Sequence, residues 1–309
     1  MKLVGISDKN GHYAIDKTYT KQDTVKELEG LVTRILGEEY VSWFSFNVAD
    51  DPDKKGMSYF RIEDSDGKIK ISGATGCDIA SGLNHYLKYY CNVSVSQETK
   101  QTNMPQSIVK VGKAVTKDTK LTLRYAYNYC TLSYTMPFFG YDDWRRELDF
   151  LFLNGVNLIL DTTATEALWV YYLQSLGYSA DDAKNYVCGY AYKAWWLMGN
   201  LEGYGGNVSD SWVLDTLEMA RQNQRYMTVM GAQPALQTFV GAMPETFGTL
   251  AKDHLLSKGY SDVSKALASQ GTWSGETRPN VLRTDYDGYT YLARLFYDSQ
   301  NYIYGEITD

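Results

Sequence analysis

The spacing of apolar positions changes from helical to strand-like and back within the first 115 residues. Between positions 25 and 36, apolar residues recur every three or four positions, which is typical of one buried face of an amphipathic helix over residues 22–37. Gly37 follows the last apolar position and suits the C-terminal cap. A second helix is predicted over about residues 78–90, after a glycine-rich turn.

Strand-like patterns lie between these two helices. Residues 41–48 and 57–63 alternate between apolar and polar positions or run apolar, as strands do. Asp66 and Gly67 form a turn signal, and residues 68–72 follow it as the return strand of a hairpin. These segments predict an antiparallel sheet.

The sheet and the two helices predict a small α+β domain over residues 1–118. The Thr- and Lys-rich stretch 113–120 is interpreted as the connection to the next domain. Over residues 119–309, strand-like and helical segments alternate, and the strands are nearly continuous apolar runs. Such strand–helix units are typical of a parallel sheet covered by helices.

The second region predicts the first half of a TIM-type (β/α)8 barrel. Its strand-like segments lie within residues 121–131, 154–162, 226–239 and 301–309. Its helical segments lie near residues 142–154, 165–176, 180–196, 210–225, 245–258 and 288–301. A complete barrel needs eight strands and typically about 250 residues. The predicted fold class is therefore α/β, with a small α+β N-terminal domain and an incomplete barrel that stops after about its fourth strand.

The composition is that of an ordinary globular protein and argues against two classes of partner. The 309 residues carry a formal net charge of −7, and 44% of them are apolar. Nucleic acids and anionic membranes require clustered Lys and Arg, whereas the basic residues here are scattered. No run of about 18 apolar residues is present, and the start lacks the apolar segment of a signal peptide. The compartment stays open between an intracellular protein and one whose signal has been lost.

The cysteine and histidine content predicts neither a metal site nor a cofactor. The four cysteines form no CxxC pair, and only three histidines are present. A zinc site needs its ligands at denser spacing. Four cysteines permit two disulfides but do not require any.

Six stretches carry the motifs that bear most on function. They are SGATGCDIASGLNHYLKYYC (residues 72–91), RYAYNYCTLSYTMPFFGYDDWRRELD (124–149), NGVNLILDTTATEALW (154–169), AYKAWWLMGN (191–200), GAQPALQTFVGAMPE (231–245) and IYGEITD (303–309). In sequence, order and spacing these stretches resemble the alpha-N-acetylglucosaminidase family of glycoside hydrolases. The resemblance covers about residues 20–309.

This resemblance implies a glycosidase that removes terminal alpha-linked N-acetylglucosamine from a glycan, without a cofactor. It implies a retaining mechanism with two glutamates, one acting as acid and base and the other as nucleophile. In the family both glutamates come after the segment that corresponds to residues 303–309, so both are expected beyond Asp309. No catalytic residue is therefore expected within this chain, and Glu306 is not assigned to catalysis because the family keeps no glutamate there.

The resemblance also implies six positions that contact the sugar. They are Asn128, Cys130, Tyr134, Trp195, Met198 and Trp273. Asn and Tyr can hydrogen-bond sugar hydroxyls or the N-acetyl group, a Trp face stacks on the apolar face of a pyranose, and Met can surround the acetyl methyl group. The alternative is that these residues only pack within the protein, as we expect for Trp196.

Asp161 and Glu166 follow the second predicted strand and so belong to the face of a barrel that normally carries the active site. The sequence assigns neither a role, and a structural hydrogen bond or ion pair is an equally good interpretation.

Two other functions stay open at this point. One is a carbohydrate-binding or decoy module that keeps part of the pocket without chemistry. The other is a thiol hydrolase with Cys130 as nucleophile and His85 or His254 as base. No local signature of cysteine proteases surrounds Cys130.

Overall fold

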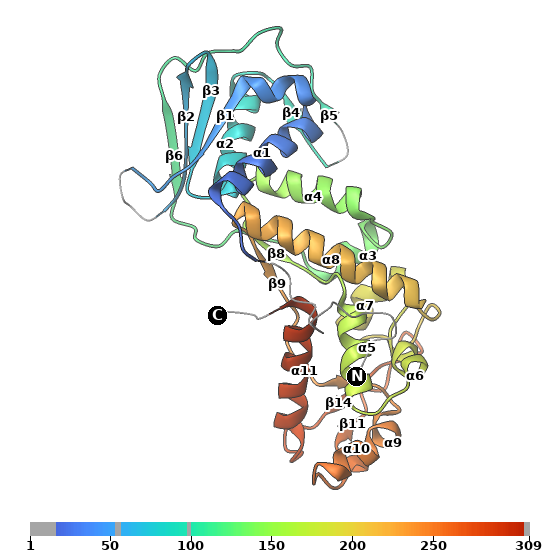
Figure 1. The fold of residues 1–309 in the computed structure, drawn as a ribbon. Helices are drawn as coiled ribbons and strands as arrows, with labels where there is room; N and C mark the ends of the chain where they lie inside the picture. Colours follow the sequence, from blue (N-terminus) through green and yellow to red (C-terminus); the bar gives the residue numbers. More distant parts are fainter. Residues whose placement is uncertain (1–16, 53–56, 98–99, 306–309) are drawn as a thin grey trace.

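The structure, a computed structural model, describes residues 17–52, 57–97 and 100–305. The molecule is elongated, with a helix-and-sheet unit at one end (Figure 1). Two long helices, α4 (Tyr141–Leu153) and α8 (Asp210–Met230), cross its middle, and the last part of the chain forms the other end. Within the described ranges, no helix is both long and apolar enough to cross a membrane.

The first helix, α1 (Lys21–Ile35), confirms the amphipathic pattern. Its buried residues include Leu28, Val32 and Ile35, which the spacing assigns to one face. Thr20 caps its N-terminus by accepting a hydrogen bond from the backbone of Asp23, in a capping box. The helix therefore begins and ends close to the predicted limits.

The N-terminal sheet is mixed, which corrects the predicted antiparallel sheet. Its strand order is β1-β3-β2-β6, and β1 runs parallel to β3 while the other neighbours are antiparallel. The strands are β1 (Phe44–Val48), β2 (Ser58–Ser65), β3 (Lys68–Gly73) and β6 (Val115–Thr119), and a 3-10 helix η1 (Glu38–Trp43) precedes them. Residues 113–120 are therefore not only a connection, because β6 within them is the edge strand beside β2.

The second predicted helix, α2 (Gly76–Tyr89), packs on this sheet. A Cβ atom on Gly82 would lie 2.8 Å from Ile71 Cγ2, so only glycine permits this close approach of helix and sheet. After α2, the short strands β4 (Ser94–Val95) and β5 (Lys100–Gln101) form a hairpin.

A parallel sheet of three short strands forms the start of the barrel. Its strands β7 (Tyr125–Ala126), β8 (Leu158–Leu160) and β9 (Gln233–Ala235) are neighbours in that order. The first predicted strand, residues 121–131, was too long, because the chain turns into helix α3 (Tyr129–Thr135).

The fourth predicted strand, residues 301–309, is wrong where the structure describes it. Residues 301–304 belong to helix α11 (Tyr289–Tyr304), whose buried face includes Ile303 and Tyr304. Residues 306–309, with Glu306 and the last residue Asp309, lie outside the described residues. The expectation that the catalytic glutamates come beyond Asp309 therefore stays a prediction.

The connections between the three barrel strands are mostly helical. Helices α3 and α4 lead from the first strand to the second. The excursion between β8 and β9 contains α5 (Thr165–Ser175), α6 (Ala180–Tyr186), η2 (Tyr190–Tyr192), α7 (Lys193–Leu197) and α8. The single helix predicted over 180–196 is thus broken, because Val187 and Gly189 are not helical.

After β9 the chain forms a lobe of short elements before α11. They are β10 (Ala242–Met243), α9 (Phe247–Leu250), α10 (Lys252–Ser257), η3 (Val263–Lys265), β11 (Leu267–Ala268), β12 (Thr272–Trp273), β13 (Glu276–Thr277) and β14 (Asn280–Leu282). Strands β10, β14 and β11 make a small antiparallel sheet that the sequence pattern did not predict.

One hydrophobic core joins the N-terminal unit to the barrel helices. Helices α1 and α2 pack against α4 and α8, and Leu31, Leu83, Phe152 and Met227 belong to the same buried cluster. An ion pair reinforces the contact, because Arg34 donates to Asp149 at 2.6 and 2.9 Å. The division into residues 1–118 and 119–309 stays a prediction, and this core crosses it.

Candidate functional site

The carboxyl ends of β7 and β8 lie beside the short helices α3 and α7. Asn128 follows β7 and caps α3, since its side-chain oxygen accepts a hydrogen bond from the backbone of Thr131 at 3.2 Å. The preceding residue, Tyr127, has a positive φ of 79°, which turns the chain sharply out of the strand. The first barrel strand therefore ends before Asn128, and a helix begins directly after it.

Helices α3 and α7 pack together, with the exposed Tyr134 on α3 beside the half-buried Trp195 on α7. The rings of Tyr134 and Trp195 meet edge to face, with centroids 5.5 Å apart. Tyr134 is 76% exposed, which is unusual for a ring of this size. Met198, at the C-terminal cap of α7, is also exposed. We call Tyr134, Trp195 and Met198 the α3–α7 surface.

Of the remaining predicted sugar-contacting residues, Asn128 and Cys130 lie at the start of α3, whereas Trp273 lies on a separate hairpin. Cys130 is half-buried in the first turn of α3. Trp273 is partly exposed on the hairpin of β12 and β13, and it makes no ring contact with Tyr134 or Trp195. Arg278, directly after this hairpin, donates to the carbonyl oxygen of Gly199 in the turn that follows α7, at 3.1 Å.

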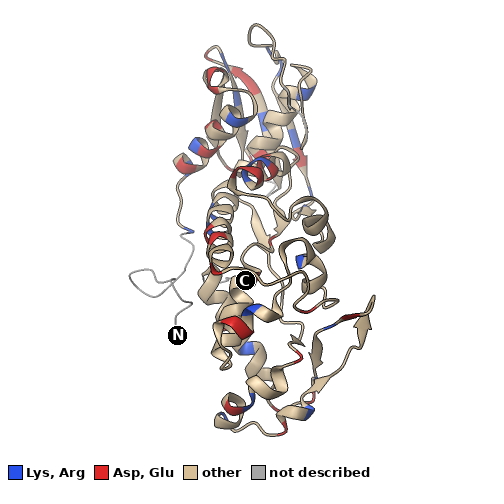
Figure 2. Cartoon of the chain, turned by 90° about the vertical axis from the view of Figure 1, so that its right-hand side faces the viewer, with Lys and Arg blue, Asp and Glu red and all other residues tan. Residues whose placement is uncertain are grey.

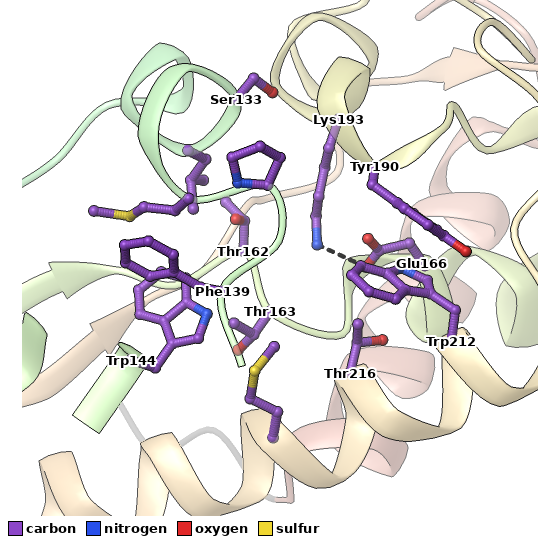
Figure 3. Close-up of a pocket in the computed structure, with 14 residues that line it drawn as sticks. Ser133, Phe139, Trp144, Thr162, Thr163, Glu166, Tyr190, Lys193, Trp212 and Thr216 are labelled. Atoms are coloured by element: carbon purple, nitrogen blue, oxygen red, sulfur yellow. Dashed lines mark hydrogen bonds and ion pairs between the residues drawn. The ribbon is translucent and has the colours of Figure 1, made fainter. Parts of the chain in front are cut away.

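A buried ion pair lies beneath the α3–α7 surface. Lys193 Nζ donates to Glu166 at 2.6 Å, and only 14% of the Lys193 side chain and 2% of the Glu166 side chain are exposed. Figure 3 shows Lys193 reaching from α7 toward Glu166 on α5. The ion-pair interpretation of Glu166 is thus confirmed. Lys193 was missed, although it is the one charged residue in AYKAWWLMGN.

A small cavity adjoins this ion pair on the side of α8 (Figure 3). Its volume of about 30 Å³ holds about two water molecules and no sugar ring. Two buried polar atoms, Thr162 Oγ1 and Trp212 Nε1, have no hydrogen-bond partner within the described residues. None of the six predicted sugar-contacting residues lines this cavity. The cavity is therefore too small to be the sugar site and lies behind the α3–α7 surface.

Asp161 is a structural carboxylate in this arrangement. It is buried after β8 and accepts hydrogen bonds from the Thr163 backbone at 2.9 Å, the Thr163 hydroxyl at 2.5 Å and Gln224 at 2.7 Å. Burial raises its pKa above the ordinary value, and these hydrogen bonds partly offset that effect. Its oxygens are engaged with the protein and tie the end of β8 to α8.

The structure gives the thiol hypothesis no support. His85 packs against Phe60 and Tyr89, and His254 hydrogen-bonds the hydroxyl of Tyr291 at 2.8 Å. Neither histidine is in position beside Cys130, so the thiol has no general base from these two residues.

The other cysteines are buried and free. Burial raises the pKa of the Cys188 thiol to about 12, and it also raises the pKa values of Cys77 and Cys91.

Trp196 is buried against Trp169 and Tyr186, as expected for a core residue.

The charged residues of the described chain are interspersed. Figure 2 shows acidic and basic side chains spread over all its parts rather than gathered in a basic patch. No group of three or more His, Cys, Asp and Glu side chains within the described residues is arranged to hold a metal ion.

Two family profiles match this chain. Residues 124–309 match the profile described as the alpha-N-acetylglucosaminidase TIM-barrel domain. Residues 26–108 match the alpha-N-acetylglucosaminidase N-terminal domain. Human alpha-N-acetylglucosaminidase is 30% identical to this chain over 220 residues, which are 71% of this chain and 30% of the human protein.

Solved structures of a family 89 glycoside hydrolase from Clostridium perfringens are also similar. Its complex with PUGNAc superposes with a TM-score of 0.86 at 35% identity, over 95% of this chain and 32% of that one. A variant of the Clostridium enzyme with two glutamates replaced by glutamine, in complex with its substrate GlcNAc-alpha-1,4-galactose, matches equally well. This chain spans about a third of the length of these relatives.

Proposed function

Because this chain belongs to the alpha-N-acetylglucosaminidase family of glycoside hydrolases, we propose that it forms the first part of an exo-acting enzyme. That enzyme releases terminal alpha-linked N-acetylglucosamine from a glycan. The substrate complex of the Clostridium relative, which contains an alpha-linked GlcNAc, supports this substrate class. The observation in this chain that carries the proposal is the exposed α3–α7 surface at the carboxyl ends of the barrel strands.

The proposed mechanism is retaining, with two glutamates that are not among these 309 residues. In such a mechanism one carboxylate attacks the anomeric carbon while the other first donates and then accepts a proton, at a separation of about 5–5.5 Å. The pair of glutamates replaced in the substrate complex of the Clostridium relative is consistent with this arrangement. Glu166 and Asp161 do not fill these roles, because each is buried against internal partners.

Each part of the proposed sugar site has a distinct task. The rings of Tyr134 and Trp195 offer apolar faces to the C–H face of a pyranose, and Met198 lies beside them for the acetyl methyl group. Asn128 and Cys130, at the start of α3, supply polar contacts. Trp273, on the hairpin of β12 and β13, is the sixth residue of the proposed site.

The two edges of the three-stranded sheet support the proposal that further strands complete the site. Beside β9 lies a cavity of about 800 Å³, and the buried Gln237, which lines it, has an Oε1 atom without a partner in the described chain. Beside β7, Leu121, Leu123 and Tyr125 are exposed. A closed barrel pairs both edges with neighbouring strands, so we propose that the 309 residues alone are inactive.

A non-catalytic carbohydrate-binding module is the second candidate. The same surface favours it, because sugar binding needs the aromatic faces and not the two glutamates. Under this alternative, the chain binds N-acetylglucosamine, and joining it to the remaining two thirds of a relative produces no hydrolase.

Sugar binding by the α3–α7 surface is tested by saturation-transfer NMR with N-acetylglucosamine and the 309-residue chain. We expect a signal at the acetyl methyl group, because Met198 and the rings surround it, and a loss of that signal in Tyr134→Ala. The control is Tyr89→Ala, since Tyr89 is similarly exposed, at 71%, but lies in the N-terminal unit. Equal acetyl-methyl signals from Tyr134→Ala and Tyr89→Ala would show that Tyr134 does not contact the sugar.

A further inference from the structure

Helix α7 carries Trp195 but is too short to hold its own position. It spans five residues, Lys193–Leu197, and no side chain caps its N-terminus. Isolated helices of this length are unstable in water, so their geometry depends on contacts with the rest of the protein. The direction in which Trp195 points is therefore set by whatever anchors α7.

Two polar contacts anchor the start of α7, one to each neighbouring element. The backbone N–H of Ala194 donates to Ser133 Oγ on α3 at 2.9 Å. Lys193 Nζ donates to Glu166 on α5 at 2.6 Å. The two anchoring residues are close in sequence to the two rings, because Ser133 precedes Tyr134 and Lys193 lies two positions before Trp195.

Helix geometry places the anchor and the ring on opposite sides of α7. Residues two apart in an α-helix differ by about 200° around its axis. Lys193 accordingly lines the buried cavity, whereas Trp195 meets Tyr134 at the surface. Figure 3 shows this inner side, with the Lys193 side chain pointing toward Glu166.

Glu166 is itself fixed on the barrel. It lies in the first turn of α5, directly after the loop that follows β8, where a carboxylate also interacts favourably with the helix N-terminus. Only 2% of its side chain is exposed, so Lys193 pairs with a carboxylate that is almost fully removed from solvent. The ion pair thus links the end of a barrel strand to the helix that carries the sugar-facing ring.

We propose that Glu166 and Lys193 are positioning residues that fix Trp195 against Tyr134 for sugar binding. They touch no sugar and act through α7. This inference rests on the proposed function for the role of the α3–α7 surface, while the geometric link from the ion pair to Trp195 can be measured without any sugar.

The test uses the 309-residue chain labelled with fluorotryptophan and observed by fluorine NMR. The chain has seven tryptophans, and Trp195→Phe identifies the resonance of Trp195. In Lys193→Met we expect that resonance to shift or broaden while the resonance of Trp43, in the N-terminal unit, stays in place. Lys193→Arg keeps the charge and should return the Trp195 resonance toward its original position.

The matched control is Lys184→Met. Lys184 has nearly the same exposure as Lys193, with 13% of its side chain exposed, and it pairs with Asp210 at 2.7 Å, away from α3. If Lys193→Met fails to fold, the double variant Glu166→Gln with Lys193→Met replaces it. That variant removes both charges of the ion pair, so neither is left buried without its partner. The double variant should also move the Trp195 resonance.

N-acetylglucosamine titrations of the same variants give the second readout. We expect about tenfold weaker binding in Lys193→Met and recovery in Lys193→Arg, since small displacements at a positioned site weaken binding strongly. An unmoved Trp195 resonance in both Lys193→Met and the double variant would overturn the proposal. If the wild-type chain binds no sugar, the proposed site is wrong, and the fluorine resonances still decide the positioning role.

Discussion

At the scale of single residues, the side chains that fix the site pair with residues distant in sequence. Glu166 and Lys193 are 27 positions apart, and Asp161 and Gln224 are 63 apart. No local pattern encodes such pairs. The family motifs did point to Tyr134 and Trp195, whose rings the structure brings together. The assignment of the six residues to sugar binding stays a proposal.

Glu202 gives the molecule a specific pH dependence. Its carboxylate accepts hydrogen bonds from the Glu245 backbone at 2.9 and 3.1 Å, and burial raises its pKa from the ordinary 4.5 to about 7. Between these two pH values the unfolded chain loses the proton while the folded chain keeps it. Glu202 therefore lowers the stability of the fold progressively as pH rises from 4.5 to about 7.

We predict that Glu202→Gln gains stability relative to wild type over this range. The variant cannot ionise, so the difference between the two melting temperatures should grow from pH 4.5 to about pH 7 and then level off. Thermal unfolding at several pH values measures it, with Glu276→Gln, on the exposed hairpin, as control. If the melting temperatures of wild type and Glu202→Gln differ by the same amount at every pH, the burial of Glu202 does not make stability depend on pH in this range.

At the scale of elements, long periodic helices were predicted well and short segments were not. Helices α1, α4, α5 and α8 begin within a few residues of their predicted limits. The first barrel strand was predicted too long because the apolar run continues past Asn128, whose capping side chain starts a helix instead. Short apolar runs fit a strand and a buried helix equally, which explains why residues 301–304 were wrongly read as a strand.

The contact between α2 and the N-terminal sheet yields a prediction about Gly82. Alanine in a helix interior is normally better than glycine by about 1 kcal/mol. At Gly82, however, the added methyl group would lie 2.8 Å from Ile71 and 3.1 Å from Phe60. We expect Gly82→Ala to lower the free energy of unfolding by about 1–3 kcal/mol, because overpacking outweighs the helix preference.

Urea denaturation measures this effect, and Gly248→Ala is the control. Gly248 lies in the short helix α9, where the nearest atom to an added Cβ is 3.8 Å away. That substitution should be neutral or slightly stabilising. A Gly82→Ala variant as stable as Gly248→Ala would mean that α2 does not pack on the sheet as closely as the structure shows.

At the scale of the whole molecule, the N-terminal unit and the barrel helices share a core. Asp149 on α4 accepts hydrogen bonds from Arg34 on α1 and, at 2.5 Å, from Tyr226 on α8. These three helices come from both sides of the predicted boundary at residue 118. We therefore expect the two parts to unfold together.

Substitution of Asp149 tests this coupling. Asp149→Asn leaves the guanidinium of Arg34 without its carboxylate. We expect a loss of about 2 kcal/mol in the free energy of unfolding, less than for fully buried pairs because 31% of the Arg34 side chain is exposed. The control Asp262→Asn breaks an exposed pair and should cost under about 0.5 kcal/mol. Two separate unfolding transitions, with only one shifted by Asp149→Asn, would contradict a shared core.

We propose that these residues provide the sugar-binding side of an alpha-N-acetylglucosaminidase whose catalytic glutamates are not among them. The most direct measurement is hydrolysis of an aryl alpha-N-acetylglucosaminide by the 309-residue chain alone and by the same chain joined, after Asp309, to the remaining two thirds of the Clostridium perfringens relative. We expect no turnover by the chain alone and clear turnover by the joined protein. Turnover by the chain alone that is abolished by Glu166→Gln or Asp161→Asn would contradict it.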